Sequence, residues 1–344
     1  MSELVRVALD AMGGDFAPAE AVKGAVDAVC HEERVDVTLY GTEDAVNAEL
    51  AKYTYPKERL HVHPTTEVIE MAEPPVNAIR TKKDSSIVAG LMSVRHGEND
   101  AFVTAGSSGA TLVGGQLLVG RIKGIERPPF APLIPTANGP LLLLDCGANV
   151  DARPTQLVQF AQMGSIYMEN VVGVKNPRVA LFNIGAEAEK GNALTKETYP
   201  LLAALDNINF TGNIEARDIP FGAADVVVTD AFAGNAILKM YEGTADMFKQ
   251  QVKEAIYSST RGKLGGLLLK PVLGKTFKKF STSTYGGAPL LGLTGLVVKT
   301  HGNAKAISIE HSIEQCVNFK EKRINDQFRE KMHLVDHTRK EQKS

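Results

Sequence analysis

The sequence has few of the features that mark secreted, membrane-spanning or disulfide-linked proteins. Its three cysteines, Cys30, Cys146 and Cys316, are odd in number and far apart. They argue against a disulfide framework and fit a reducing compartment. No run of about 18 apolar residues is long enough to cross a membrane. The N-terminus also lacks the basic head and apolar stretch of a signal peptide, so we expect a cytoplasmic protein.

Charge and histidine content argue against two further classes. The formal net charge is only −2, so no global field attracts nucleic acid. The eight histidines show no metal-ligand spacing. His61 and His63 alternate along a predicted strand, but no other ligand pattern accompanies them. We expect no nucleic-acid partner, no metal site and no cofactor.

Short apolar runs alternate with longer amphipathic stretches along the 344 residues. Strands are predicted at 5–10, 36–41, 60–63, 100–105, 141–146, 178–185, 208–212 and 225–230, with helical patterns at 19–29, 85–97 and 155–171. This alternation predicts an α/β fold with a mostly parallel sheet covered on both faces. We expect one large domain over residues 1–330, or two lobes that share a continuous sheet. Residues 331–344 form a charged tail that we expect to fray.

Several predicted strands end in a polar turn that contains glycine. The turns read DAMGGD (10–15), TAGSSGA (104–110), DCGANVD (145–151), NIGAEAEKGN (183–192) and TDAFAGN (229–235). In parallel sheets, ligands bind beyond the carboxyl ends of the strands, and small residues at helix starts suit anions. We therefore predict a shared, phosphate-binding crevice. Its candidate residues are Asp10, Gly13, Gly14, Asp15, Gly106, Ser107, Ser108, Gly109, Asn149 and Asn235.

Some of these residues allow a second interpretation. The stretch around Ser108 also matches a nucleophile elbow, G-x-S-x-[GA], but no acid and histidine partners follow in a recognisable context. Asp15 fits a helix cap as well as a ligand contact. Cys146 fits a small buried thiol better than a nucleophile. Lys190 lies between Glu187 and Glu189, so it suits either anion binding or a solvated loop.

Residues 258–280 differ in character from the rest of the chain. The segment contains six basic residues and no acid, interleaved with apolar side chains. We predict contact with an anionic membrane or an acidic carrier through Lys263, Leu267, Leu268, Leu269, Lys270, Val272, Leu273 and Lys278. A helix docked at a subunit interface is the alternative. Pro271 and four glycines argue against one long regular helix.

Five motifs together resemble the PlsX phosphate acyltransferases. They are LDAMGGDFAP (9–18), LDCGANVD (144–151), NIGAEAEKGN (183–192), TDAFAGNAILKMYEG (229–243) and STYGGAPLLGLTGLVVKTHGNA (283–304). The resemblance implies a three-layer αβα fold similar to phosphotransacetylases and the isopropylmalate dehydrogenase group, with a protruding helical segment. It implies transfer of a fatty acyl group from acyl carrier protein to inorganic phosphate, giving acyl phosphate for bacterial phospholipid synthesis. It also implies a homodimer in peripheral contact with an anionic membrane, near the downstream glycerol-3-phosphate acyltransferase.

The expected chemistry is direct transfer, with Lys190 neutralising phosphate and Asp230 orienting Lys190 or accepting a proton. His301, next to a glycine, is a further candidate for either task. The family usually has DGFTGN where this chain has DAFAGN (230–235), so Ala231 would be strained if its φ had to be positive. A serine thioesterase using Ser108 and a non-catalytic lipid- or carrier-binding protein remain open. A dehydrogenase rests on fold analogy alone, because no G-x-G-x-x-G follows the first strand.

Overall fold

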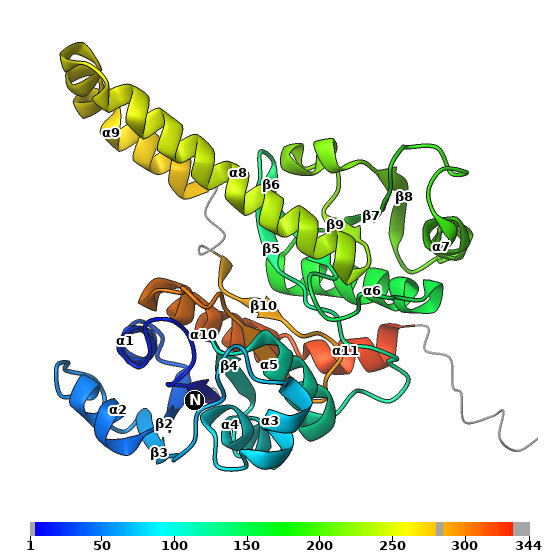
Figure 1. The fold of residues 1–344 in the computed structure, drawn as a ribbon. Coiled ribbons are helices and arrows are strands. Elements are labelled where there is room, and N and C mark those ends of the chain that lie inside the picture. The colour runs from blue at the N-terminus through cyan, green and yellow to red at the C-terminus, as the bar shows by residue number, and fades with distance from the viewer. Residues whose placement is uncertain (1–3, 280–284, 333–344) are drawn as a thin grey trace, which may run out of the picture.

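The computed structural model describes residues 4–279 and 285–332, which form two sheets flanked by helices (Figure 1). The six-stranded sheet has the order β10-β11-β4-β1-β2-β3. Its strands are β1 (Val5–Asp10), β2 (Val35–Gly41), β3 (Leu60–Pro64), β4 (Ala101–Thr104), β10 (Ala288–Pro289) and β11 (Leu296–Lys299). Every pairing in this sheet is parallel except that of β10 with β11.

The five-stranded sheet has the order β5-β6-β9-β7-β8, and only β5 runs antiparallel to its neighbour. Its strands are β5 (Leu133–Thr136), β6 (Gly139–Leu144), β7 (Arg178–Phe182), β8 (Asn209–Ile214) and β9 (Val226–Val228). The predicted α/β class with mostly parallel sheets is therefore confirmed.

A continuous sheet through two lobes, one of the two arrangements that we expected, is not formed. The sheets approach each other at Phe130, which makes an isolated bridge to Leu290. The surrounding segment reads RPPFAP (127–132), and its three prolines have no N–H to donate to a ladder. The two sheets nevertheless share one buried apolar cluster, which includes Leu9 from β1 and Leu144 from β6.

The helices surround these sheets and supply much of the core. They are α1 (Ala19–His31), α2 (Glu43–Leu50), α3 (Pro75–Thr81), α4 (Ser86–Arg95), α5 (Ser108–Gly114), α6 (Pro154–Tyr167), α7 (Ala193–Ala203), α8 (Ala231–Tyr257), α9 (Thr260–Lys279), α10 (Ala306–Glu321) and α11 (Ile324–Lys331). No helix within the described ranges is long and apolar enough to cross a bilayer.

Helices α8 and α9 form a hairpin that projects from the body of the molecule (Figure 1). The expectation that Pro271 and the glycines prevent a long helix was wrong, because α9 spans 20 residues and contains Pro271 in its interior. Two glycines serve helix packing instead. A Cβ on Gly266 would lie 2.3 Å from Ile256 Cγ2, and one on Gly262 would lie 2.5 Å from the Ile256 carbonyl oxygen. The predicted contact of the Lys278 side chain and the tail residues 333–344 fall outside the described residues.

Candidate active site

A cavity of about 570 Å³ lies where strand ends of both sheets meet. The six-stranded sheet contributes Ser108, which follows β4, and Lys299, the last residue of β11. The five-stranded sheet contributes Gly147 after β6 and Asn235 on α8, the helix that follows β9. Of the predicted site residues, the cavity thus brings together Ser108, Asn235 and His301. We call it the inter-sheet pocket.

Lys299 is a cation of the pocket lining that was not predicted from the sequence. Its side chain is buried with only 8% of the residue exposed, yet it lines the inter-sheet pocket. Nζ donates to the carbonyl oxygens of Ala105, at 3.3 Å, and of Thr300. Burial lowers the pKa of Lys299 to about 8, although the nearby carboxylates of Asp10 and Asp15 oppose that shift. Lys299 is therefore a cation held at the pocket wall with no ion-pair partner within 4 Å among the residues that the structure describes.

Asp10 anchors a hydrogen-bond network beneath this wall. The Thr104 hydroxyl donates to Asp10 Oδ2 at 2.6 Å and accepts from the Gly106 N–H at 2.8 Å. The Met12 N–H donates to Asp10 Oδ1 at 3.1 Å. Burial raises the pKa of Asp10, and the hydroxyls of Thr104 and Ser86 work against that rise. Asp10 thus ties the end of β1 to the end of β4 and is not exposed to a ligand.

Gly13 and Gly14 allow the turn after β1 to pack closely against neighbouring loops. A Cβ on Gly13 would lie 2.3 Å from Asp10 Oδ2 and 2.5 Å from the Gly106 nitrogen. Gly14 has φ +96°, a conformation that L side chains rarely adopt. The next residue, Asp15, donates its N–H to the Gly302 carbonyl at 2.7 Å. This turn therefore fixes the relative positions of three strand-end loops, and none of its residues lines the inter-sheet pocket.

In the turn after β4, Ser107 and Gly109 have structural roles, whereas Ser108 lines the inter-sheet pocket. The Ser107 hydroxyl caps α5 by accepting from the Ala110 N–H at 3.3 Å. A Cβ on Gly109 would lie 2.5 Å from Pro75 Cγ, so Gly109 allows α3 and α5 to pack. Ser108 is exposed and lines the pocket, and it forms no hydrogen bond to a histidine in the described ranges. The described residues thus do not form the serine–histidine pair that a nucleophile elbow requires.

Lys190 lies in the loop after β7 and does not line the inter-sheet pocket. Its Nζ forms an ion pair with Glu187 Oε1 at 2.8 Å, which also raises the pKa of Lys190. Asp230 caps α8 by accepting from the Ala233 N–H at 2.8 Å. The expected orientation of Lys190 by Asp230 is therefore not formed, because Glu187 is the nearer partner in the same loop.

Ala231 carries none of the strain that the sequence comparison suggested. It is the first residue of α8 and is absent from the described residues with positive φ. Its N–H donates to the Asn149 carbonyl at 2.9 Å. An alanine is compatible with this helical position, so the departure from DGFTGN does not distort the backbone here.

Asn149 belongs to a loop held by Asp145, a second residue that the sequence reasoning missed. The Asn149 amide donates to Asp145 Oδ2 at 2.7 Å and to the Pro128 carbonyl at 3.1 Å. Asp145 also accepts from the backbone N–H groups of Phe130, Gly147, Ala148 and Asn149. Burial raises the pKa of Asp145, while these donors stabilise its carboxylate. The loop is thus rigidly attached to the end of β6.

His301 meets α8 across the pocket. Its Nε2 lies 2.9 Å from Glu242 Oε1, and both residues line the inter-sheet pocket with Asn235. Glu242 was not among the predicted residues, since it lies twelve positions into the long sequence of α8. Within the part of the chain that the structure describes, no group of three or more histidine, cysteine or acidic side chains could hold a metal ion.

Comparison with known proteins agrees with this architecture. Residues 5–327 match the sequence model described as "Fatty acid synthesis protein". Phosphate acyltransferase of Clostridium novyi is 48% identical over 94% of this chain and 98% of that protein. Phosphate acyltransferase of Clostridium acetobutylicum is 47% identical, over 94% and 97%. The chain therefore belongs to the phosphate acyltransferase family. The family resemblance inferred from the five motifs is therefore confirmed.

Solved structures extend the fold relationship. A phosphotransacetylase from Streptococcus pyogenes superposes with a TM-score of 0.59 at 15% identity, covering 93% of this chain and 95% of the other. EutD phosphotransacetylase from Staphylococcus aureus gives 0.58 at 14% identity, covering 92% and 94%. At such low identity these similarities establish the fold alone. They agree with the phosphotransacetylase-like fold that the resemblance implied.

Proposed function

We propose that this chain transfers a fatty acyl group from acyl carrier protein to inorganic phosphate and releases acyl phosphate. Its curated relatives are named phosphate acyltransferases. We assign the reaction to the inter-sheet pocket because this cavity combines a buried cation with apolar side chains. The cation is Lys299, and the apolar lining includes Phe130, Leu133 and Leu238. A polar end suits phosphate, and an apolar lining suits an acyl chain. Nothing in the comparisons favours hydrolysis at Ser108.

The reaction needs orientation and charge stabilisation more than strong acid or base catalysis. An oxygen of hydrogenphosphate bonds to the thioester carbon, the carbon–sulfur bond breaks, and the departing thiolate takes up the phosphate proton. Because a thiol has a pKa of roughly 8.5, the thiolate leaves readily. The enzyme then contributes mainly by holding phosphate beside the thioester and stabilising the tetrahedral oxyanion.

Lys299 is the first candidate for holding phosphate, since it is a buried residue of the pocket lining whose ammonium has no carboxylate within 4 Å among the described residues. Ser108 and Asn235 offer a hydroxyl and an amide in the same cavity. His301, positioned by Glu242, can donate to the oxyanion or to the leaving sulfur. Lys190 remains a second candidate for neutralising phosphate, although its ammonium forms an ion pair with Glu187.

The test is product formation with and without phosphate. The purified protein is incubated with a fatty acyl thioester of acyl carrier protein, and acyl phosphate is separated from free fatty acid. We expect acyl phosphate only when phosphate is present. Release of fatty acid at the same rate without phosphate, and lost in Ser108→Ala, would instead support the thioesterase. Binding without any turnover would support a non-catalytic carrier-binding protein.

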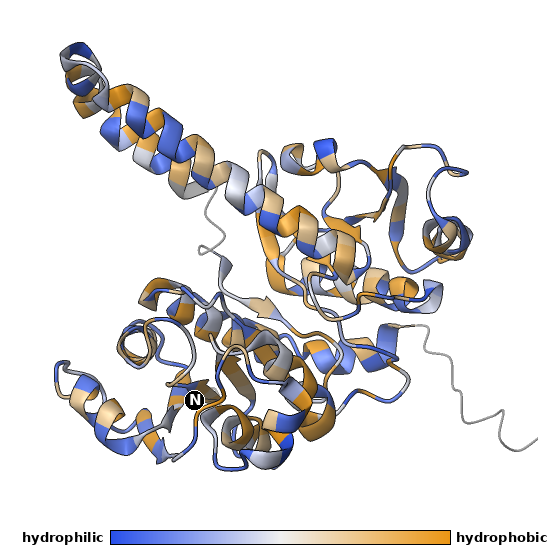
Figure 2. Cartoon of the chain, in the orientation of Figure 1, coloured by the Kyte–Doolittle hydropathy of each residue, from blue (hydrophilic) through white to orange (hydrophobic). Residues whose placement is uncertain are grey.

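We also propose that the α8–α9 hairpin mediates association, both with a second copy of this chain and with an anionic membrane. Large apolar side chains along both helices are exposed, including Met240, Phe248, Leu264, Leu267 and Leu268. Figure 2 shows hydrophobic and hydrophilic residues interspersed along the hairpin. Basic residues between apolar ones favour a lipid surface with negative charge. The protein would then be cytoplasmic and peripherally membrane-bound, and acyl phosphate could pass to the glycerol-3-phosphate acyltransferase.

A further inference from the structure

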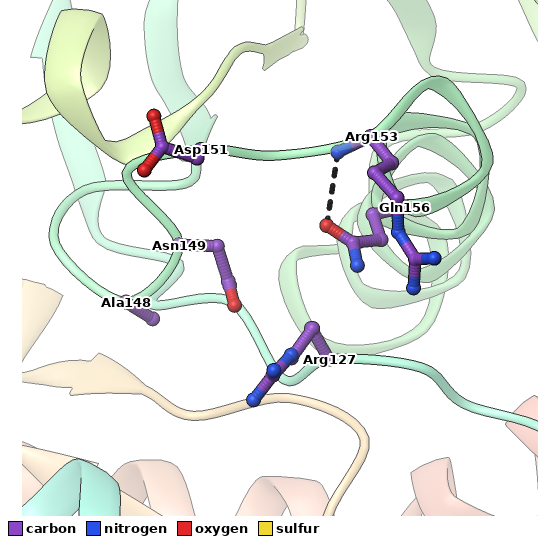
Figure 3. Close-up of a pocket in the computed structure, with 6 residues that line it drawn as sticks. All are labelled: Arg127, Ala148, Asn149, Asp151, Arg153 and Gln156. Carbon is purple, nitrogen blue, oxygen red and sulfur yellow. Dashed lines mark hydrogen bonds between the residues drawn. The ribbon is translucent and has the colours of Figure 1, made fainter.

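A second cavity, of about 520 Å³, lies beside the inter-sheet pocket and is not used by the proposed chemistry. Its lining is Arg127, Ala148, Asn149, Asp151, Arg153 and Gln156 (Figure 3). A neighbouring cavity of about 410 Å³ shares Arg127 and Arg153 and adds Arg121. We call these two adjoining cavities the arginine pocket.

The arginine pocket contains a guanidinium with no carboxylate partner among the residues that the structure describes. Arg153 forms an ion pair with Glu126 at 2.8 Å, and Arg121 donates to the backbone carbonyl of Glu126. Arg127 is exposed, and its contact is a 3.3 Å hydrogen bond to the neutral Gln116 amide. In the described ranges no carboxylate lies within ion-pair distance of Arg127. In Figure 3 the Asp151 carboxylate points away from both arginines, so Arg127 is available to an anion.

Consecutive residues of one loop line the inter-sheet pocket and the arginine pocket. Gly147 lines the inter-sheet pocket, and the next residue, Ala148, lines the arginine pocket. Consecutive Cα atoms are about 3.8 Å apart, so the two linings meet along this loop. Asp145 holds both residues by accepting from their N–H groups at 3.1 Å. The boundary between the two linings is therefore held in place by Asp145.

We propose that Arg127 and Arg153 bind the phosphodiester of the thioester donor's arm while the thioester enters the inter-sheet pocket. This inference rests on the proposed function. An acyl carrier protein presents its thiol at the end of a long arm that a phosphodiester joins to the protein, so phosphate and thioester must be bound at separate points. Guanidinium groups match phosphate oxygens in a planar, bidentate geometry. Inorganic phosphate, in contrast, must reach the thioester carbon itself and belongs with Lys299.

The same phosphate chemistry occurs in acyl-coenzyme A, and a phosphate-free acyl-pantetheine lacks it. We would compare kcat/KM for these three donors in the wild type, Arg127→Gln, Arg153→Gln and Arg127→Lys. Arg217→Gln is the matched control, because Arg217 lies in the 3-10 helix Ala216–Phe221, outside the arginine pocket, and its exposed side chain forms an ion pair with Glu215. We expect Arg127→Gln to lower the ratio of kcat/KM for carrier thioester over acyl-pantetheine about tenfold or more. Arg127→Lys should lose less, and the KM for inorganic phosphate should stay constant.

Three outcomes would overturn this assignment. An equal loss with acyl-pantetheine would mean that the arginines do not contact the donor phosphate. A higher KM for inorganic phosphate would assign the pocket to the acceptor instead. A loss with acyl-coenzyme A alone would exclude the carrier arm as the ligand.

A binding measurement separates this inference from the proposed function. Fluorescence anisotropy compares holo-carrier protein with the apo form, which lacks the arm and its phosphodiester. We expect the wild type to bind the holo form more tightly and Arg127→Gln to remove that difference. If no donor yields acyl phosphate, the proposed function fails, yet the holo-versus-apo difference still tests the arginine pocket. Equal binding of both forms by the wild type would overturn the pocket assignment alone.

Discussion

Replacing Lys299 with methionine should abolish activity while stabilising the fold. Burial lowers the Lys299 pKa from 10.5 to about 8. At about 1.4 kcal/mol per pKa unit, keeping this ammonium charged at pH 7 costs the folded state about 3 kcal/mol. Methionine fills a similar volume without charge. The substitution also removes the donor to the carbonyls of Ala105 and Thr300. Each lost hydrogen bond lowers the stability by about 1 kcal/mol and so offsets part of the stabilisation. We therefore expect a net stabilisation of about 1 kcal/mol.

Urea unfolding at pH 7 measures the stability of Lys299→Met, and acyl phosphate formation measures its function. We expect turnover to fall at least about 100-fold, since a buried charge at the acceptor site is lost. The stability gain should be largest below pH 8 and shrink as the pH rises toward 10.5. Between pH 8 and 10.5, Lys299 is protonated in the unfolded chain but neutral in the folded protein. The folded wild type then no longer has to bury a charge, so its stability rises toward that of the variant. If the variant keeps the wild-type KM for phosphate, Lys299 does not bind phosphate; if the variant is markedly less stable, the buried charge does not destabilise the fold.

Four further predictions follow from the same structure. The KM for phosphate in the wild type should rise above pH 8 as Lys299 loses its proton, whereas a KM that stays flat to pH 9.5 would exclude it as the phosphate cation. Gly13→Ala should lower the free energy of unfolding in urea by about 1–3 kcal/mol, because its Cβ would lie 2.3 Å from a carboxylate oxygen. As a control, Gly243→Ala on α8, whose Cβ would meet nothing within 4 Å, should raise it by about 0.5–1 kcal/mol. Lys190→Ala should lower phosphate-dependent turnover, and full activity would remove it from the scheme. Changing leucines 267–269 to serine should reduce sedimentation with anionic liposomes, and unchanged pelleting would exclude the membrane proposal for that stretch.

The sequence anticipated the parallel core because its strands are long apolar runs that end in polar turns. Leu141–Leu144 illustrates this, since all four side chains are fully buried in β6. The strands β5, β10 and β11 were not predicted. They lie in stretches rich in glycine and proline, where the apolar pattern is too short to distinguish a strand from a loop.

The sequence indicated only some of the loops that line the inter-sheet pocket. The glycine turns after β4, β6 and β9 contribute Ser108, Gly147 and Asn235, whereas the turns after β1 and β7 do not line it. Gly13 and Gly109 serve contacts within the protein that only the folded backbone reveals. Lys299 had one usable signal, because it directly follows the apolar run Leu296–Val298 as the acids follow other strands. Its pairing with the end of β4, which puts it beside Asp10, depends on strand order and could not be obtained from spacing.

We infer that phosphate itself attacks the thioester in the inter-sheet pocket, without an acyl-enzyme. The most direct measurement is a rapid-quench single turnover with radiolabelled phosphate and acyl carrier protein thioester, followed by mass spectrometry of the protein. We expect label to appear in organic-soluble acyl phosphate as fast as the carrier thiol is released, with no acylated protein at any time. An acyl group on Ser108 or Cys146 before label appears in the product would contradict it.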